Sequence, residues 1–207
     1  MSEDLKPKRH HTFVLQPELL KIPRRFVSAE FDELTAEPAK DNGEAFILNF
    51  DYFYEQGIAP SFIGTAGTGK TYASAVIARR LDREGIPCFW VSVVKALNKL
   101  MDYKDFRMKD EYFALKRNII TTPYVVMDDF SHLQTFTRTR ELFYELVDTR
   151  YASKLPTTFT ANVDLNKIES GGIIKNESAI TNTLEEKFGA AVIRRVKAMS
   201  EGMLLLG

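Results

Sequence analysis

Apolar and polar positions divide the chain into short apolar runs and longer segments whose apolar positions recur at helical spacing. The apolar runs predict buried strands at 61–64, 88–93, 124–130, 157–162 and 203–207. The helical spacing predicts helices at 44–56, 93–103, 108–118 and 139–154, another with its apolar stripe on Ala73, Val76, Ile77 and Leu81, and one or two more within 178–199. Strands that alternate with helices predict an α/β fold, with helices flanking a central parallel five-stranded sheet.

The first 25 residues do not continue this pattern. Pro7, Pro17 and Pro23 argue against one long helix there. We therefore expect residues 1–25 to form an N-terminal extension and residues 26–207 to form the core domain. The extension either docks on a partner or folds back on the core through its apolar side chains. These are Phe13, Val14, Leu15, Leu19 and Leu20.

Composition narrows the classes of function. The 207 residues include 28 basic and 28 acidic ones, so no global charge draws the chain to nucleic acid or membrane, and any basic site is local. No apolar run is long enough to span a bilayer, and no secretory signal is visible. The single cysteine, Cys88, excludes an internal disulfide, which favours a reducing cytoplasm.

The strand at 61–64 leads into the sequence GTAGTGKT at 64–71, which opens the next helix. Glycines at this spacing let successive backbone N–H groups face one phosphate, and the helix N-terminus adds partial positive charge. Lys70 is the expected point charge for the β- and γ-phosphates, and the Thr71 hydroxyl is the expected ligand of Mg²⁺. The predicted nucleotide-binding residues are Gly64, Thr65, Ala66, Gly67, Thr68, Gly69, Lys70, Thr71 and Tyr72.

Polar residues also end two other predicted strands. Asp128 and Asp129 follow the apolar run at 124–127, at the sheet edge where parallel α/β proteins bind ligands. Asp128 is expected to hold the magnesium ion, and Asp129 to orient or deprotonate the attacking water. Asn162 ends the strand at 157–162, where its amide can contact the γ-phosphate or that water. Each could instead be a simple strand-ending turn residue.

From these segments the chain resembles the AAA+ ATPases, and more closely the DnaC-type helicase loaders and IstB-type transposition ATPases. The resemblance spans roughly residues 22–207 and rests on IPRRF, GTAGTGKT, VVMDDF, LFYELVDTRY, PTTFTAN and VIRRV, in that order. It implies a P-loop NTPase of AAA+ type that binds ATP and Mg²⁺ and has no C-terminal lid domain. It also implies slow or DNA-stimulated ATP hydrolysis.

In that family an arginine near the C-terminus completes the ATP site of a neighbouring subunit. The resemblance implies this role for Arg195, which we favour, or for Arg194, and a place at a subunit boundary for Arg150. It further implies self-association into a ring or spiral. The alternative for the arginine pair is a solvated basic helix end. His132 stands in a segment where the family often has glycine, and is either an exposed loop residue or a contact to the phosphates.

A basic segment with interleaved aromatic residues lies at 95–117, between the second and third predicted strands. Charge that neutralises a backbone, combined with stacking rings, is the chemistry of single-strand binding, and the family's DNA-facing element falls in this region. The predicted DNA-binding residues are Lys99, Lys104 and Arg107. The alternative is that the aromatic side chains belong to the core.

The resemblance favours a loader that places a hexameric, DnaB-type replicative helicase on single-stranded DNA. The alternative within the same fold is an IstB-like ATPase that assists DNA transposition. A small-molecule P-loop kinase is less favoured, because no arginine-rich lid stands between Asp129 and the strand at 157–162. The sequence does not identify the client, the subunit number or the host.

Overall fold

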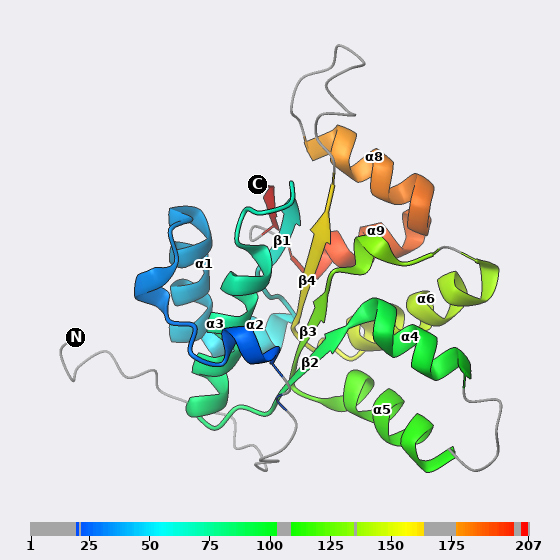
Figure 1. Cartoon of the computed structure of the whole chain (residues 1–207), viewed down its shortest axis with the longest axis horizontal. Coiled ribbons are helices and arrows are strands. Elements are labelled where there is room, and N and C mark those ends of the chain that lie inside the picture. Colours follow the sequence, from blue (N-terminus) through cyan, green and yellow to red (C-terminus); the bar gives the residue numbers. More distant parts are fainter. Residues whose placement is uncertain are drawn as a thin grey trace.

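A parallel sheet with helices on both faces forms the body of the computed structural model (Figure 1). The structure describes residue 20 and residues 22–102, 109–134, 136–163, 177–200 and 204–206. The strands lie in the order β2-β3-β4-β1-β5, and every pairing is parallel. The predicted α/β class and the parallel sheet flanked by helices are therefore confirmed.

The strands are β1 (Ser61–Gly64), β2 (Cys88–Ser92), β3 (Tyr124–Asp128), β4 (Thr157–Asn162) and β5 (Leu204–Leu206). The helices are α1 (Glu37–Leu48), α2 (Phe50–Gln56), α3 (Lys70–Arg83), α4 (Val93–Asp102), α5 (Lys109–Thr121), α6 (Thr137–Ala152), α8 (Glu177–Phe188) and α9 (Ala190–Ala198). Short 3₁₀ turns are η2 (Arg24–Phe26), η3 (Phe31–Glu33) and η5 (Phe130–His132).

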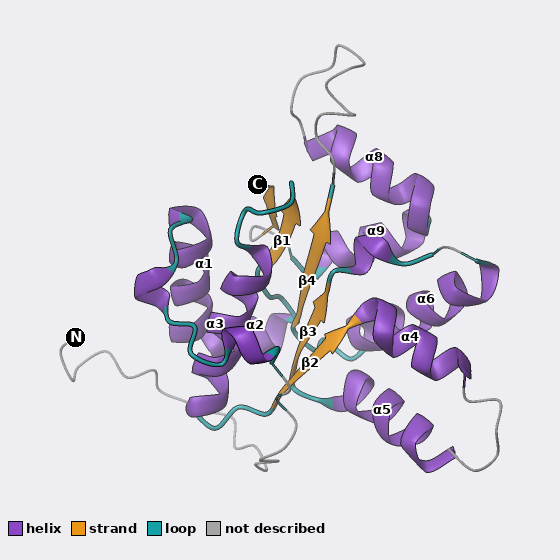
Figure 2. Ribbon diagram, in the orientation of Figure 1, coloured by secondary structure: helices purple, strands orange, loops and turns teal. Residues whose placement is uncertain are grey.

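Two apolar clusters, one on each face of the sheet, explain why these segments fold together. Side chains of α1, α2 and α3 pack with Trp90, Tyr124 and Val126 on one face. The helices α4, α5, α6, α8 and α9 cover the other face (Figure 2). Their side chains pack there with Val125 and Met127. Alternate residues of β3 enter opposite clusters because successive strand side chains point to opposite faces. The continuous apolar run of β3 is thus buried on both sides.

Three element predictions need correction or refinement. The single helix expected at 44–56 is two helices, since α1 begins earlier, at Glu37, and the helix is interrupted at Asn49. The segment 178–199 also forms two helices, α8 and α9, separated by Gly189 at φ 92°, a conformation that favours glycine. Of the five strands expected, β1 to β4 form the central part of the sheet, and β5 is a three-residue strand beside β1 at the edge. The absence of a lid stays a prediction.

Arg150 lies in the interior rather than at a surface. Its side chain is fully buried, and its guanidinium donates to the carbonyls of Ile119, Thr122 and Pro156 and to the Thr157 hydroxyl, at 2.7–2.9 Å. The placement of Arg150 at a subunit boundary is therefore wrong. The side chain instead joins α6 to the end of α5 and to the segment that leads into β4, because its fork of donors can satisfy several buried acceptors at once.

Candidate functional site

Three strands bring their polar ends to one edge of the sheet. Gly64, at the end of β1, pairs with Asn162, at the end of β4. Asp128 ends β3, the next strand after β4 in the sheet. The carboxyl ends of parallel strands meet at the same edge, so residues far apart in sequence converge there. The convergence expected of Asp128, Asp129 and Asn162 with the glycine loop is confirmed.

The glycine loop connects β1 directly to the first turn of α3, as its sequence predicts. Gly67 and Gly69 adopt φ values of 85° and 81°, in the left-handed region that favours glycine. A Cβ atom added to either would meet no heavy atom within 4 Å, so conformation and not crowding requires glycine here. The loop thus leaves open space above the N-terminus of α3, where backbone N–H groups and the helix dipole favour an anion.

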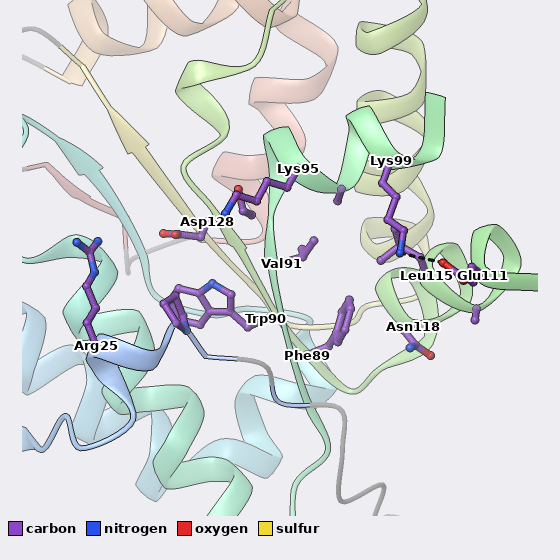
Figure 3. Close-up of a pocket in the computed structure, with 14 residues that line it drawn as sticks. Arg25, Phe89, Trp90, Val91, Lys95, Lys99, Glu111, Leu115, Asn118 and Asp128 are labelled. Carbon is purple, nitrogen blue, oxygen red and sulfur yellow. Dashed lines mark ion pairs between the residues drawn. The ribbon is translucent and has the colours of Figure 1, made fainter. Parts of the chain in front are cut away.

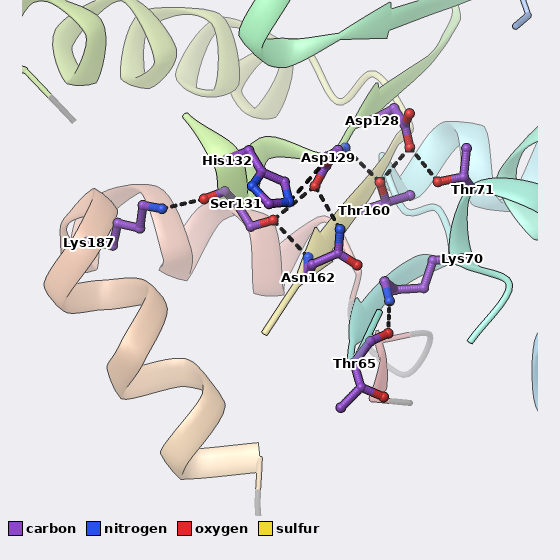
Figure 4. Close-up of polar contacts among 10 residues, drawn as sticks. All are labelled: Thr65, Lys70, Thr71, Asp128, Asp129, Ser131, His132, Thr160, Asn162 and Lys187. Carbon is purple, nitrogen blue, oxygen red and sulfur yellow. Dashed lines mark hydrogen bonds and ion pairs between the residues drawn. The ribbon is translucent and has the colours of Figure 1, made fainter. Parts of the chain in front are cut away.

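Lys70 is the first residue of α3, and its side chain is only 9% exposed. Its ammonium donates to the Thr65 carbonyl (Figure 4) and, at 3.1 Å, to the Thr68 hydroxyl, both within the glycine loop. Burial lowers the pKa of Lys70, and the nearby charge of Asp129 opposes that shift. A partly desolvated cation with only neutral acceptors in its own loop fits a phosphate oxygen as its stronger partner.

Asp128 is held by two threonine hydroxyls. Thr71, on α3, donates to Asp128 Oδ1 at 3.1 Å, and Thr160, on β4, donates to the same oxygen at 2.7 Å (Figure 4). Burial raises the pKa of Asp128, the two hydroxyls lower it, and the charge of Asp129 raises it further. A half-buried carboxylate beside a hydroxyl fits Mg²⁺, which is typically bound through one or two carboxylates, water and substrate phosphates. Within the described residues no three His, Cys, Asp or Glu side chains form a closed metal site.

Asp129 points away from Asp128 and joins a different set of contacts. Its backbone lies at φ 55°, ψ 53°, which is uncommon for a residue other than glycine. Asp129 Oδ1 accepts from the Asn162 amide at 3.1 Å and from the Ser131 hydroxyl at 3.0 Å (Figure 4). The two adjacent carboxylates therefore have different hydrogen-bond partners, and their roles toward a metal ion and a water stay predictions.

Sequence reasoning missed three residues of this network. Thr160 accepts from the Asp129 backbone N–H at 2.7 Å while it donates to Asp128, so one hydroxyl bridges both aspartates. The Ser131 hydroxyl contacts both Asp129 and the backbone of Asn162, and Lys187, on α8, donates to the Ser131 carbonyl. Thr160 could have been found from its position two residues before Asn162, on the same face of β4. No sequence signal placed Lys187.

The two arginines of α9 have different surroundings. Arg195 donates to Asp148 at 2.5 Å and to the Tyr144 hydroxyl at 3.0 Å, both on α6, and its guanidinium lies over the Tyr144 ring. Arg194 is exposed, and among the described residues no hydrogen bond or ion pair holds it. Arg195 is thus held within its own chain, whereas Arg194 faces outward. The trans role of either arginine stays a prediction.

Tyr72 and His132 lie beside the central network. The Tyr72 hydroxyl bonds with Glu33 and with the Glu30 backbone, and its ring packs edge-on against Phe26, so it fastens the segment before α1 to α3. His132 is exposed, with Nε2 3.6 Å from Asp129 Oδ2. Tyr72 directly follows Thr71 in the chain, and His132 lies beside Asp129. A nucleotide contact by Tyr72 stays a prediction, and for His132 it stays the alternative to an exposed loop residue.

A groove of about 810 Å³ runs along the edge strand β2, between η2 and the helices α4 and α5 (Figure 3). Arg25, Lys95 and Lys99 contribute positive charge, and Asp128 reaches one end of the groove. Lys99 forms an ion pair with Glu111 at 3.1 Å. The predicted DNA-binding residue Lys99 thus lines a groove, whereas Lys104 and Arg107 lie outside the described residues.

Comparisons with known proteins agree with the fold. The family model of IstB-like ATP binding proteins matches residues 12–184. A comparison with curated proteins gives no match. The crystal structure of the DnaC helicase loader is similar at a TM-score of 0.70 and 21% identity, covering 89% of this chain and 99% of that one. The crystal structure of DnaI is similar at a TM-score of 0.63 and 21% identity, covering 90% and 95%.

A more distant likeness is to the replication initiator DnaA bound to AMPPCP and single-stranded DNA. The TM-score is 0.55 at 15% identity, covering 88% of this chain and 68% of that one. These likenesses support the AAA+ fold. Within the described residues, no helix has the length and apolar character needed to cross a membrane.

Proposed function

Because this chain belongs to the family of IstB-like ATP binding proteins, we propose that it is an ATP-dependent loader of a hexameric replicative helicase onto single-stranded DNA. The observation that carries the proposal is the bond between Asn162 and Asp129 beside the glycine loop. It joins a residue able to detect the γ-phosphate to a residue able to act on water. The fold likeness to the DnaC helicase loader supports the choice of client.

The residues of the site have separable roles in ATP hydrolysis. The glycine loop and Lys70 hold the phosphates, and Thr71 and Asp128 hold Mg²⁺. When bound, that ion neutralises charge on the β- and γ-phosphate oxygens. Asp129 orients or deprotonates the attacking water, and Asn162 holds that carboxylate and responds to the γ-phosphate. ATP binding then times the assembly, and hydrolysis releases it.

The site is shared between subunits of a ring or spiral, in this proposal. An arginine of α9 reaches the γ-phosphate of the neighbouring subunit, where its guanidinium stabilises the developing charge. The exposure of Arg194 favours it for direct contact. Arg195, bound to Asp148 and Tyr144, then serves to hold α9 against α6. This reverses the preference for Arg195 that the sequence suggested.

Single-stranded DNA binds along the groove beside β2, in this proposal, with Lys95 and Lys99 neutralising phosphates. Lys104 and Arg107 extend the same basic segment. The N-terminal extension at 1–25 is the proposed helicase-binding segment, with residues 26–207 as the ATPase domain.

The DNA proposal is tested with Lys95→Ala/Lys99→Ala. Affinity for single-stranded DNA in the presence of ATP should fall, and the salt dependence of binding should weaken by about 1.4 in log–log slope, because two phosphate contacts are lost. Lys40→Ala/Arg80→Ala, which removes two charges on the opposite layer, should leave that slope unchanged. An unchanged slope in the Lys95/Lys99 variant would exclude the groove.

The client is tested by affinity capture from the native source with the Asp129→Asn variant loaded with ATP. Because hydrolysis is blocked, the assembled complex should persist, and a ring-shaped helicase should be captured. Purified helicase should then acquire strand-unwinding activity on circular single-stranded DNA only with the wild-type chain and ATP. Capture without ATP-dependent loading would contradict the proposal.

The second candidate function is an ATPase that assists DNA transposition, which the match to the IstB-like family model favours. It shares the ATP site and the DNA groove, so the client alone separates the two functions. Capture of a transposase by the same Asp129→Asn variant, with no helicase, would select this candidate.

A further inference from the structure

We propose that Ser131 is a positioning residue for ATP hydrolysis, holding the Asp129 carboxylate and the Asn162 backbone at one point. The inference rests on the ATPase activity proposed above and adds to that proposal one further residue, which acts through Asp129. Ser131 stands in the segment directly after the two aspartates, where the family that the chain resembles often has glycine and this chain has Phe130, Ser131 and His132.

The geometry around Ser131 forms a closed ring of hydrogen bonds. The Ser131 hydroxyl donates to Asp129 Oδ1 at 3.0 Å and accepts from the Asn162 backbone N–H at 2.8 Å. The Asn162 side-chain amide donates to the same Oδ1 at 3.1 Å (Figure 4). One hydroxyl therefore fixes the distance between the water-activating carboxylate and the residue that detects the γ-phosphate.

Ser131 is itself held rigidly. It is 7% exposed, and the preceding residue, Phe130, is fully buried against the rings of Phe143, Phe159 and Phe188. On its other side, Ser131 has its carbonyl bound by the ammonium of Lys187. A positioning group must be fixed by its own packing and hydrogen bonds, and Ser131 meets this condition from two directions.

Asp129 needs such support because of its backbone. At φ 55° a residue other than glycine is strained and persists only when its surroundings determine its conformation. The bonds from Ser131 and Asn162 both engage Oδ1. Oδ2, which lies 3.6 Å from His132 Nε2, is then the oxygen that can accept from a water. Without the serine hydroxyl, the carboxylate could rotate, and fewer of its conformers would place an oxygen correctly for attack.

This role predicts a loss of turnover without a loss of nucleotide affinity. Ser131→Ala should lower kcat by about 10- to 100-fold, the range for losing one hydrogen bond to a charged group. The Kd for a fluorescent ATP analogue should change by less than about twofold, since Ser131 does not face the glycine loop. Ser131→Cys, which keeps the size but has only a weak donor, should resemble Ser131→Ala, and Ser131→Thr should recover most of the rate.

The experiment is a double-mutant cycle on the full chain, in single-turnover hydrolysis of ATP. If Ser131 acts through Asp129, Ser131→Ala should have little further effect in the Asp129→Asn background. Ser200→Ala is the matched control, because it removes another buried serine hydroxyl, bonded to Ser61 at 2.6 Å away from the two aspartates. It should leave kcat unchanged.

Three results would overturn the inference. They are an unchanged kcat in both Ser131→Ala and Ser131→Cys, an equal loss with and without the Asp129 carboxylate, and a loss of ATP affinity that matches the loss of rate. The proposed ATPase activity fails separately, if neither Lys70→Met nor Asp129→Asn lowers the turnover of the purified chain. If those two variants lose activity and the Ser131 variants do not, only the role of Ser131 is wrong.

Discussion

Thr160, on β4, is hydrogen-bonded to both aspartates. Its hydroxyl has one hydrogen atom, donated to Asp128, and one lone pair engaged by the Asp129 N–H. Because the side chain is 2% exposed, water cannot replace either bond. Single residues in this site therefore act in pairs, and removing one hydroxyl changes two neighbours at once.

The first prediction concerns Thr160→Val, which keeps the shape and removes the hydroxyl. The free energy of unfolding should fall by about 1–3 kcal/mol, because the Asp128 carboxylate and the Asp129 N–H, both half-buried, lose a partner. ATP hydrolysis should fall by at least about tenfold, because both aspartates are displaced.

Thr158→Val is the control: its hydroxyl is also buried and bonds to Pro60 and Tyr124, away from the phosphate loop. Chemical denaturation should show a similar loss for the control, with normal hydrolysis; equal activity in both variants would contradict the role of Thr160.

The second prediction concerns Lys70→Met in the absence of nucleotide. Burial lowers the pKa of Lys70 in the folded chain, so the unfolded chain binds the proton more tightly and the charged side chain destabilises the fold at neutral pH. The free energy of unfolding of the variant should therefore be about 1 kcal/mol higher than that of the wild type at pH 7.5. Added ATP should stabilise the wild type and not the variant. The difference should narrow as pH rises toward the unfolded pKa of about 10.4. Urea denaturation at two pH values measures this, and a less stable variant at both would contradict it.

At the scale of elements, α6 connects the starts of β3 and β4 with α9. Arg150 fastens it to the segments that precede β3 and β4, and Tyr144 and Asp148 fasten it to α9 through Arg195. Because β3 and β4 carry the aspartates and Asn162 at their other ends, the register of these strands depends in part on this helix. The arginine of LFYELVDTRY is thus structural here.

The third prediction tests that structural role. Arg150→Met should lower the free energy of unfolding by about 3–5 kcal/mol, because three backbone carbonyls and a hydroxyl lose their buried donor. Arg150→Lys should recover only part of the loss, since a single ammonium cannot reproduce the planar fork. Arg117→Met, on the exposed face of α5, should change stability by less than about 0.5 kcal/mol. Wild-type stability in Arg150→Met would refute the assignment.

At the scale of the whole molecule, the proposed site is half of a shared one. The glycine loop, the aspartates and Asn162 lie on one surface, and the arginines of α9 belong to a different part of the chain. A head-to-tail contact between copies, which builds a ring or an open spiral, would bring these two halves together.

The fourth prediction is complementation in mixtures. Arg194→Ala should lose ATPase activity and keep its stability, whereas Arg195→Ala should also lose stability because Asp148 and Tyr144 lose their partner. A 1:1 mixture of Arg194→Ala with Lys70→Met should recover up to about a quarter of wild-type activity. In random head-to-tail assembly, about a quarter of the contacts pair an intact phosphate loop with an intact arginine. Lys70→Met mixed with Asp129→Asn, both on the same half, should recover none. Normal self-association with no recovery in the first mixture would contradict a shared site.

The sequence alone determined the order of the strands and helices. It also determined that the glycine loop, Asp128, Asp129 and Asn162 lie at the carboxyl ends of the strands. These are local signals: apolar periodicity, left-handed glycines and polar residues that end buried strands. It placed helix limits less well, as at Asn49, because propensity gives no sharp boundary there.

Only the tertiary structure decided what those residues contact. The bridge made by Thr160, the ring around Ser131 and the bond from Lys187 join positions on β4, on η5 and on α8. The tertiary structure also showed that Arg150, which the sequence placed at a surface, is buried in the core. It further showed that Arg195 is bonded within its own chain whereas Arg194 is exposed. Hydrogen bonds between distant segments depend on strand register and on the direction of each side chain, and neither is encoded in a single stretch of sequence.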